Sequence, residues 1–277
     1  MIAAKKQSRI MLALLCLSWA FSTSAMADVD HPKYTLGVFP HLPIIDLERI
    51  YAPMAADLAK ELNIDLYFKA TATFQDFKLE LESETYDFIE VQPFDYVNIA
   101  AHHNYVPLAR RDEPLAGVFV VPNNSDIKTP KDLIGKRIAV PPISSAVSRL
   151  ATDFLHKNGI QLSDVRMTYH RSHVTCLQQI LIKKADVCVT AEPTLRFFNH
   201  KMKTDLHYVL KTRSIPHVLF AVHKRVPKNL RQQAIQVITT WDDIEEKKKL
   251  LTNAKFPAFV PALDSEYDVV REISHGK

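Results

Sequence analysis

Hydroxyl and imidazole side chains follow two short apolar runs in this sequence, at points where a helical pattern begins. The first segment reads Val140-Pro-Pro-Ile-Ser-Ser-Ala-Val147, and the second reads Tyr169-His-Arg-Ser-His-Val174. The first turn of a helix presents unpaired N–H groups and the positive end of its dipole, and both favour a small anion. The two segments therefore predict a site for an oxyanion, with serine hydroxyls and an imidazole as additional donors.

A third segment of the same kind, Thr190-Ala-Glu-Pro193, places a carboxylate at the start of a helical pattern. Glu192 can stabilise the dipole of that helix, as acidic residues in a first turn commonly do. It can instead face a ligand, where it would favour an ammonium or hydroxyl group. Both interpretations stay open from the sequence.

The anion-binding residues have structural alternatives as well. Ser144 and Ser145 can act as ordinary N-caps, each contributing about 1 kcal/mol to helix stability. A histidine at a helix start, such as His173, is commonly a surface residue. If His173 contacts an anion, its pKa is expected to rise, because the negative charge favours the protonated imidazole.

The sequence contains none of the common catalytic or metal-binding patterns that would indicate an enzyme. There is no G-x-S-x-G segment, no phosphate-binding P-loop, no C-x-x-C pair and no H-E-x-x-H helix. We therefore predict a binding protein with no catalytic residues, no metal ligands and no cofactor.

The N-terminus has the pattern of a secretory signal peptide, residues 1–27. Lys5, Lys6 and Arg9 precede an apolar run that ends at Phe21, and an A-x-A pattern favours cleavage before Asp28. We expect the mature protein in the periplasm, with no later segment able to cross a membrane. A lipid anchor on Cys16 is the less favoured alternative, because Cys16 lies within the apolar run and follows a leucine.

Charge and cysteine content limit the function further. Three of the 35 basic residues lie in the signal peptide, and the remaining 32 nearly balance the 31 acidic residues, so no nucleic-acid surface is indicated. Cys176 and Cys188 remain after cleavage. An oxidising compartment permits a disulfide between them, but their apolar neighbours favour two buried free thiols.

Apolar runs alternate with helical patterns along the chain, which predicts an α/β fold. Expected strands, helices and turns follow one another from Tyr34 to Arg110, with a capping segment at Thr73 and a helix from Pro93 to about His103. The alternation restarts at Arg137 and ends near Lys211. We predict two lobes, each with a mostly parallel sheet and flanking helices, joined by two crossover strands around a cleft. The predicted boundaries are residues 28–120 plus 217–277 for lobe 1 and 121–216 for the inserted lobe 2, with mostly helical structure after Pro227.

Across its mature length the sequence resembles the phosphonate-type periplasmic substrate-binding proteins of ABC transporters, which have the two-lobed type II binding-protein fold. The segments that carry the resemblance are Arg49-Ile-Tyr-Ala-Pro53, Tyr86-Asp-Phe-Ile-Glu-Val-Gln-Pro-Phe-Asp-Tyr96, the run from Asp126 to Val140, Ser144-Ser145 and Ser172-His173. The resemblance implies that Ser144, Ser145 and His173 hold the oxyanion, with Ser172 assisting.

Residues at the facing ends of the lobe 1 strands are candidates for the organic part of the ligand. These residues are His41, Tyr51, Gln92, Phe94 and Tyr96. The sequence departs from the family in having Pro141-Pro142-Ile143 where glycine is usual and Val91-Gln92 where a residue followed by glycine is frequent. The return crossover also reads Pro216-His217, without the acid that aminophosphonate binders place there.

We therefore expect a monomeric periplasmic protein that captures a small phosphorus oxyanion or organophosphonate and delivers it to the membrane permease of an ABC transporter. The alternative is a ligand-sensing module of the same fold that signals to a membrane receptor kinase or cyclase.

Overall fold

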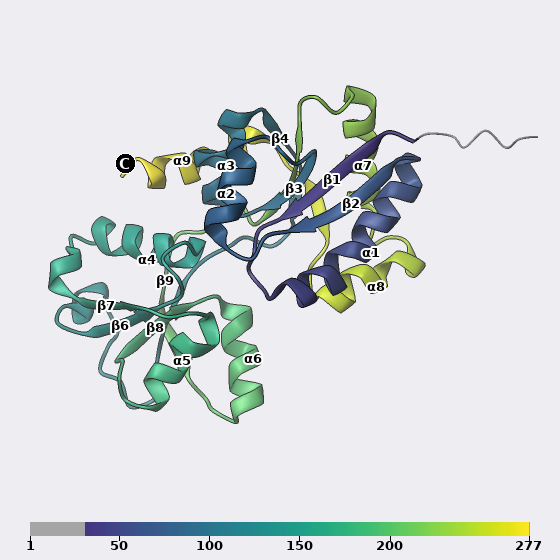
Figure 1. Ribbon diagram of the computed structural model, residues 1–277. Helices are drawn as coiled ribbons and strands as arrows, with labels where there is room; N and C mark the ends of the chain where they lie inside the picture. Colours follow the sequence, from purple (N-terminus) through teal and green to yellow (C-terminus); the bar gives the residue numbers. More distant parts are fainter. Residues whose placement is uncertain (1–30, 277) are drawn as a thin grey trace, which may run out of the picture. The chain divides into compact units, whose positions relative to one another are not determined.

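The computed structural model describes residues 31–276 and contains a six-stranded and a five-stranded mixed sheet (Figure 1). The predicted signal peptide and Cys16 lie outside the described residues. The strands of the first sheet, in spatial order, are β11 (Phe259–Pro261), β4 (Tyr105–Arg111), β10 (Leu219–His223), β3 (Phe88–Val91), β1 (Lys33–Val38) and β2 (Asp65–Ala70). The strands of the second sheet are β7 (Arg166–Tyr169), β6 (Arg137–Val140), β8 (Val187–Thr190), β5 (Val118–Val121) and β9 (His207–Lys211).

Each sheet contains an internal strand that runs antiparallel to both of its neighbours. In the first sheet β1 pairs in parallel with β2 and β3, whereas β10 pairs antiparallel with both β3 and β4. In the second sheet β6 pairs in parallel with β7 and β8, and β5 pairs antiparallel with β8 and β9. The α/β prediction is confirmed, and most strands in each sheet do share a direction.

Helices on both faces explain why β5 of the second sheet is apolar at every position. Phe119 and Val121 of β5 pack in one core with residues of α4 (Ala146–Lys157). The intervening Val118 and Val120 pack in another core with residues of α5 (His173–Leu181) and α6 (Glu192–Met202). Successive side chains of a strand point to opposite faces, so both faces need apolar residues.

A disulfide bond joins Cys176 on α5 to Cys188 on β8. The prediction of two free thiols is therefore wrong. The two residues next to Cys188 in β8 have side chains that face α4. The side chain of Cys188 therefore points to the opposite face of the sheet, where α5 lies. Apolar surroundings and pairing are compatible because a disulfide is itself apolar.

The first sheet has a larger core built from helices of both chain ends. Helix α1 (Ile44–Leu62) contacts α7 (Lys228–Thr239) and α8 (Glu245–Ala254), and α3 (Pro93–Asn98) contacts α9 (Asp268–Ser274) (Figure 1). Thr73 caps α2 (Phe74–Glu82) by accepting a hydrogen bond from the Asp76 amide at 3.1 Å, as predicted. None of the helices in residues 31–276 combines the length and apolarity needed to cross a membrane.

Two predicted elements differ from the structure. The helix expected from Pro93 to His103 ends at Asn98, because Ile99 leaves helical geometry before a short 3-10 turn at Ala100–His103. The C-terminal region, expected to be mostly helical, contributes the edge strand β11, which pairs antiparallel with β4.

Two extended segments connect the strands of one sheet to those of the other. Leu115 and Ile215 exchange two backbone hydrogen bonds of 2.9 Å, so the segments run side by side. The Gly117 amide donates to the Thr212 hydroxyl at 2.9 Å, and an added Cβ at Gly117 would lie 3.2 Å from Thr212 and Val189. Residues 32–277 form one unit by their contacts, and the lobe boundaries stay a prediction.

Candidate anion-binding site

The first predicted anion segment forms the start of α4. Ser145 is the N-cap, and its Oγ accepts a hydrogen bond from the Val147 amide at 3.3 Å. The Ser144 hydroxyl has no partner among the described residues, and neither do the amides of Ser144 and Ala146. These groups can donate to an anion, and the Ser145 hydroxyl keeps its hydrogen for the same purpose because capping uses its lone pair.

The second predicted segment forms the start of α5. Ser172 is the N-cap, and its Oγ accepts from the Thr175 amide at 3.1 Å, while the Thr175 hydroxyl accepts from the Ser172 amide at 3.0 Å. This reciprocal capping occupies Ser172. His173 is the first helical residue, and its Nδ1 lies 2.9 Å from the hydroxyl of the fully buried Thr190.

Burial lowers the pKa of His173 to about 4. Removal of the imidazole from water disfavours its charged form, and the rise expected on contact with an anion stays a prediction. At neutral pH His173 is uncharged and can donate one hydrogen bond, from whichever ring nitrogen carries the proton.

Helix α4 also connects this segment to the first sheet. The Gln92 side-chain amide donates to the Ser144 carbonyl at 2.9 Å and to Asp95 at 2.6 Å. The guanidinium of Arg149 on α4 lies 5.1 Å from the centre of the Phe94 ring on α3. The structure therefore brings Gln92, one of the predicted lobe 1 residues, to the segment with the two serines, and places Phe94, another, beside α4.

Tyr51 belongs to a buried ionic cluster that the sequence analysis did not identify. Its hydroxyl donates to Glu90 at 2.8 Å, and Glu90 pairs with Arg111 at 2.7 Å. Arg111 also covers the ring of Phe256, with 3.6 Å between the guanidinium carbon and the ring centre. A charged residue within the apolar strand Phe88–Val91 is the sequence signal that could have revealed Glu90, since charged side chains are rarely buried without a partner.

Two histidines lie beside this cluster. His41 stacks on Phe39 with 4.4 Å between ring centres, and its Nδ1 donates to the Phe39 carbonyl at 3.0 Å. His217 accepts the Val218 amide hydrogen at its own Nδ1 at 2.8 Å. Burial lowers the pKa of both imidazoles, to about 3 for His217, and the charge of Arg111 lowers both further.

Two predicted residues have partners elsewhere. The hydroxyl of the buried Tyr96 donates to Asp264 at 2.6 Å, within the contact between α3 and the C-terminal region. Glu192 accepts a hydrogen bond from Arg196 one helical turn later at 2.8 Å, which agrees with a role in stabilising α6. The structure does not connect either residue to Ser144, Ser145 or His173.

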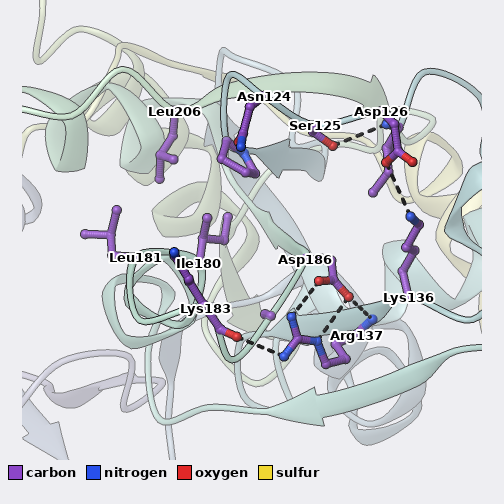
Figure 2. A pocket seen from close by; sticks show the side chains of 13 residues that line it. Asn124, Ser125, Asp126, Lys136, Arg137, Ile180, Leu181, Lys183, Asp186 and Leu206 are labelled. Carbon is purple, nitrogen blue, oxygen red and sulfur yellow. Dashed lines mark hydrogen bonds and ion pairs between the residues drawn. The ribbon is translucent and has the colours of Figure 1, made fainter.

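A surface pocket of about 560 Å³ lies at the ends of the strands of the second sheet that are opposite to the two predicted anion segments (Figure 2). Arg137 is the first residue of β6, and three hydrogen bonds to Asp186 and one to the Lys183 carbonyl hold it. Ligands of open α/β sheets bind at the carboxyl ends of strands, whereas these residues lie at the amino ends of β6 and β8. Within residues 31–276, no group of three or more His, Cys, Asp or Glu side chains is arranged to hold a metal ion.

Comparisons with solved structures identify this fold. PhnD1 from Prochlorococcus marinus in complex with methylphosphonate has a TM-score of 0.74 and 17% identity, covering 88% of this chain and 97% of its own. A protein from Xanthomonas citri bound to ATP has a TM-score of 0.74 and 15% identity, covering 88% and 96%. A binding-protein component of an ABC phosphonate transporter from Pseudomonas aeruginosa has a TM-score of 0.71 and 13% identity, covering 88% and 86%.

The fold is thus the type II periplasmic binding-protein fold, as predicted. No curated protein sequence matches the chain. Nothing in the comparisons favours the sensory role over transport. The family described as "ABC transporter, phosphonate, periplasmic substrate-binding protein" matches residues 36–267. The chain therefore belongs to the periplasmic substrate-binding proteins of phosphonate ABC transporters.

Proposed function

We propose that this protein binds the phosphonate group of its ligand at the starts of α4 and α5. The donors are the hydroxyls of Ser144 and Ser145, the free amides of Ser144 and Ala146, and the imidazole of His173. The observation that carries the proposal is the presence of unpaired donors at the start of α4, in a chain that belongs to a phosphonate-binding family. A helix start with free amides favours an oxyanion without any further charged group.

Thr190 acts as a positioning residue for His173 in this proposal. Its hydroxyl donates to Nδ1, so the ring carries its proton on Nε2 and directs it to the ligand. The lowered pKa of His173 supports a neutral imidazole, and the 2.9 Å contact joins its Nδ1 to the Thr190 hydroxyl.

The protein then closes its two predicted lobes, residues 28–120 plus 217–277 and residues 121–216, over the ligand. It functions as a periplasmic monomer after removal of residues 1–27, performs no catalysis, and delivers the ligand to the permease of an ABC transporter. Hydrogen bonds from Gln92 to Ser144 and contacts of Arg149 with Phe94 support a ligand enclosed between the two parts.

Calorimetry with the protein lacking residues 1–27 tests the ligand class. The panel consists of phosphate, phosphite, methylphosphonate, ethylphosphonate and 2-aminoethylphosphonate, with ATP added because the related Xanthomonas citri protein was solved with ATP. We expect binding of at least one phosphonate. If ATP is the only compound that binds, or if none of the compounds binds, the proposed function is overturned.

His173→Ala tests the site itself. Loss of a hydrogen bond to an anionic ligand is expected to weaken binding about tenfold or more. His156→Ala is the matched control, since His156 is an exposed residue in the last turn of α4, at the end opposite the serines. Equal affinities of the His173→Ala protein and the control would remove His173 from the site.

A further inference from the structure

The buried ion pair between Glu90 and Arg111 requires an explanation beyond stability. The Glu90 side chain is fully buried and that of Arg111 is 12% exposed. Removing two charges from water costs about as much as their attraction returns, so apolar residues of similar size would stabilise the fold equally well. A polar cluster at the carboxyl ends of strands, where ligands of this architecture bind, is better explained by recognition.

The two partners differ in what they can still offer to a ligand. Both carboxylate oxygens of Glu90 are occupied, one by Arg111 and the other by the Tyr51 hydroxyl. Arg111 contacts Glu90 and Tyr51 through Nη2 alone. Within the described residues no partner is found for its Nε or Nη1, and the buried Nε is unsatisfied. Glu90 and Phe256 therefore hold a guanidinium whose Nη1 hydrogens remain available.

The surroundings of Arg111 favour an acceptor with negative charge. His217 accepts the Val218 amide hydrogen at Nδ1, so its neutral ring carries a proton on Nε2 and is a second donor. The pKa of His217 is lowered by burial and then by the positive charge of Arg111, with no opposing effect of Glu90. At His41, on the other side of the cluster, Glu90 raises the pKa more than Arg111 lowers it. The nearest acid to His217 is the half-exposed Glu113, at 3.9 Å.

The cluster and the anion segment approach each other through β3. Glu90 lies two residues before Gln92, and both have extended backbones, so their side chains leave the chain on the same side. Gln92 in turn hydrogen-bonds the Ser144 carbonyl. The carboxyl end of β3 thus carries both Glu90 of the cluster and Gln92, which contacts the anion segment.

We propose that Arg111, with His217 as a second donor, binds a carboxylate on the organic part of the ligand, so that the preferred ligands are phosphonates that also carry a carboxylate. Glu90 is a positioning residue that fixes the orientation of the guanidinium. The inference rests on the proposed function, since it assigns the ligand's second group once the phosphonate is held at α4 and α5.

Calorimetry with matched ligands tests this inference. Phosphonoacetate and 3-phosphonopropionate are compared with ethylphosphonate and propylphosphonate, and with 2-aminoethylphosphonate as the charge-reversed compound. At least one carboxylate ligand should bind about tenfold more tightly than the alkylphosphonate of equal chain length, as one charge-assisted hydrogen bond supplies. If alkylphosphonates bind as tightly as their carboxylate counterparts, the inference fails and the proposed function stands. If no phosphonate binds, both fail.

The double variant Glu90→Gln with Arg111→Met tests the residues without leaving an unpaired buried charge. It should lose the carboxylate preference and keep its affinity for the alkylphosphonate. Arg110→Met with Glu266→Gln is the matched control, because this ion pair of 2.9 Å starts from the neighbouring residue of the same strand. If the Glu90 and Arg111 variant keeps the carboxylate preference, the assignment to Arg111 is wrong. If that variant does not fold, the comparison of ligands on the unmodified protein still decides the inference.

Discussion

At the level of single residues, His217 makes stability depend on pH. Its pKa is about 3 in the folded protein, mainly because of burial and then because of Arg111, against an ordinary value of 6.5. Below about pH 6.5 the unfolded chain binds a proton that the folded protein does not bind, so unfolding becomes easier as the pH falls. Between about pH 7 and about pH 5 this residue alone should remove about 2 kcal/mol from the free energy of unfolding.

Urea unfolding of the His217→Gln protein across this pH range provides the measurement. Glutamine can still accept the Val218 amide hydrogen but does not titrate, so the variant should lose less stability on acidification than the unmodified protein. Parallel pH profiles for the two proteins would show that His217 is protonated equally well in the folded state.

The role of a residue can be predicted from the sequence when it depends on neighbouring residues in the chain. It is harder to predict when it depends on residues that only the fold brings together. Ser145, Ser172 and His173 lie at helix starts, and this can be read from a few neighbouring residues. The Glu90 and Arg111 pair depends on the register of separate strands, which no local pattern specifies. The pKa of His173 likewise depends on burial by the whole fold, which no local pattern specifies.

At the level of secondary structure, the disulfide fixes α5 against β8 directly behind the proposed site. Cys176 lies three residues after His173 on α5, and Cys188 lies two residues before Thr190 on β8. Replacing both cysteines by serine should cost about 3 kcal/mol in the free energy of unfolding, as expected for closing a loop over a sequence separation of 12. It should also weaken phosphonate binding, because the contact between His173 and Thr190 becomes less constrained.

Urea unfolding with and without a reducing agent checks this prediction. Reduction should lower the stability of the unmodified protein and leave the double serine variant unchanged. A thiol assay that finds two free cysteines in the denatured, unreduced protein would contradict the disulfide.

The strands and helices were largely predictable because their apolar patterns are local. Fully buried strands such as Val118–Val121 read as uninterrupted apolar runs. The pair Asn158-Gly159, typical of a helix end, follows the last residue of α4, and Gly159 has a φ of 72°. Strand order is not a local property. The antiparallel insertion of β10 between β3 and β4 depends on where the chain returns after the second sheet. The edge strand β11 has only three residues, too few for a periodic pattern.

At the level of the whole molecule, one helix takes part in the packing of both sheets. Ala146 and Leu150 of α4 belong to the core of the first sheet, whereas Val147 and Ala151 belong to the core of the second. Arg213 adds an ionic connection, contacting Asp153 on α4 at 2.9 Å and Glu272 on α9 at 3.5 Å. The two sheets therefore share side chains in addition to their two connecting segments.

This shared packing predicts that the two sheets unfold together. Trp241, the only tryptophan among the described residues, is buried in the core of the first sheet, so its fluorescence reports on that sheet alone. Far-UV circular dichroism reports on the helices and strands of both sheets. In urea unfolding of the protein lacking residues 1–27, fluorescence and circular dichroism should give the same midpoint concentration, because all probes report the same transition when unfolding is cooperative.

Leu150→Ala supplies the sensitive comparison, because it removes a fully buried side chain that α4 contributes to the first core. Such a truncation is expected to lower the free energy of unfolding by about 3 kcal/mol. It should destabilise the first sheet and its packing against the second sheet. Its fluorescence midpoint should therefore fall below its circular dichroism midpoint, while the two remain equal in the unmodified protein. Separate midpoints in the unmodified protein would mean that each sheet unfolds by itself and that α4 does not couple them.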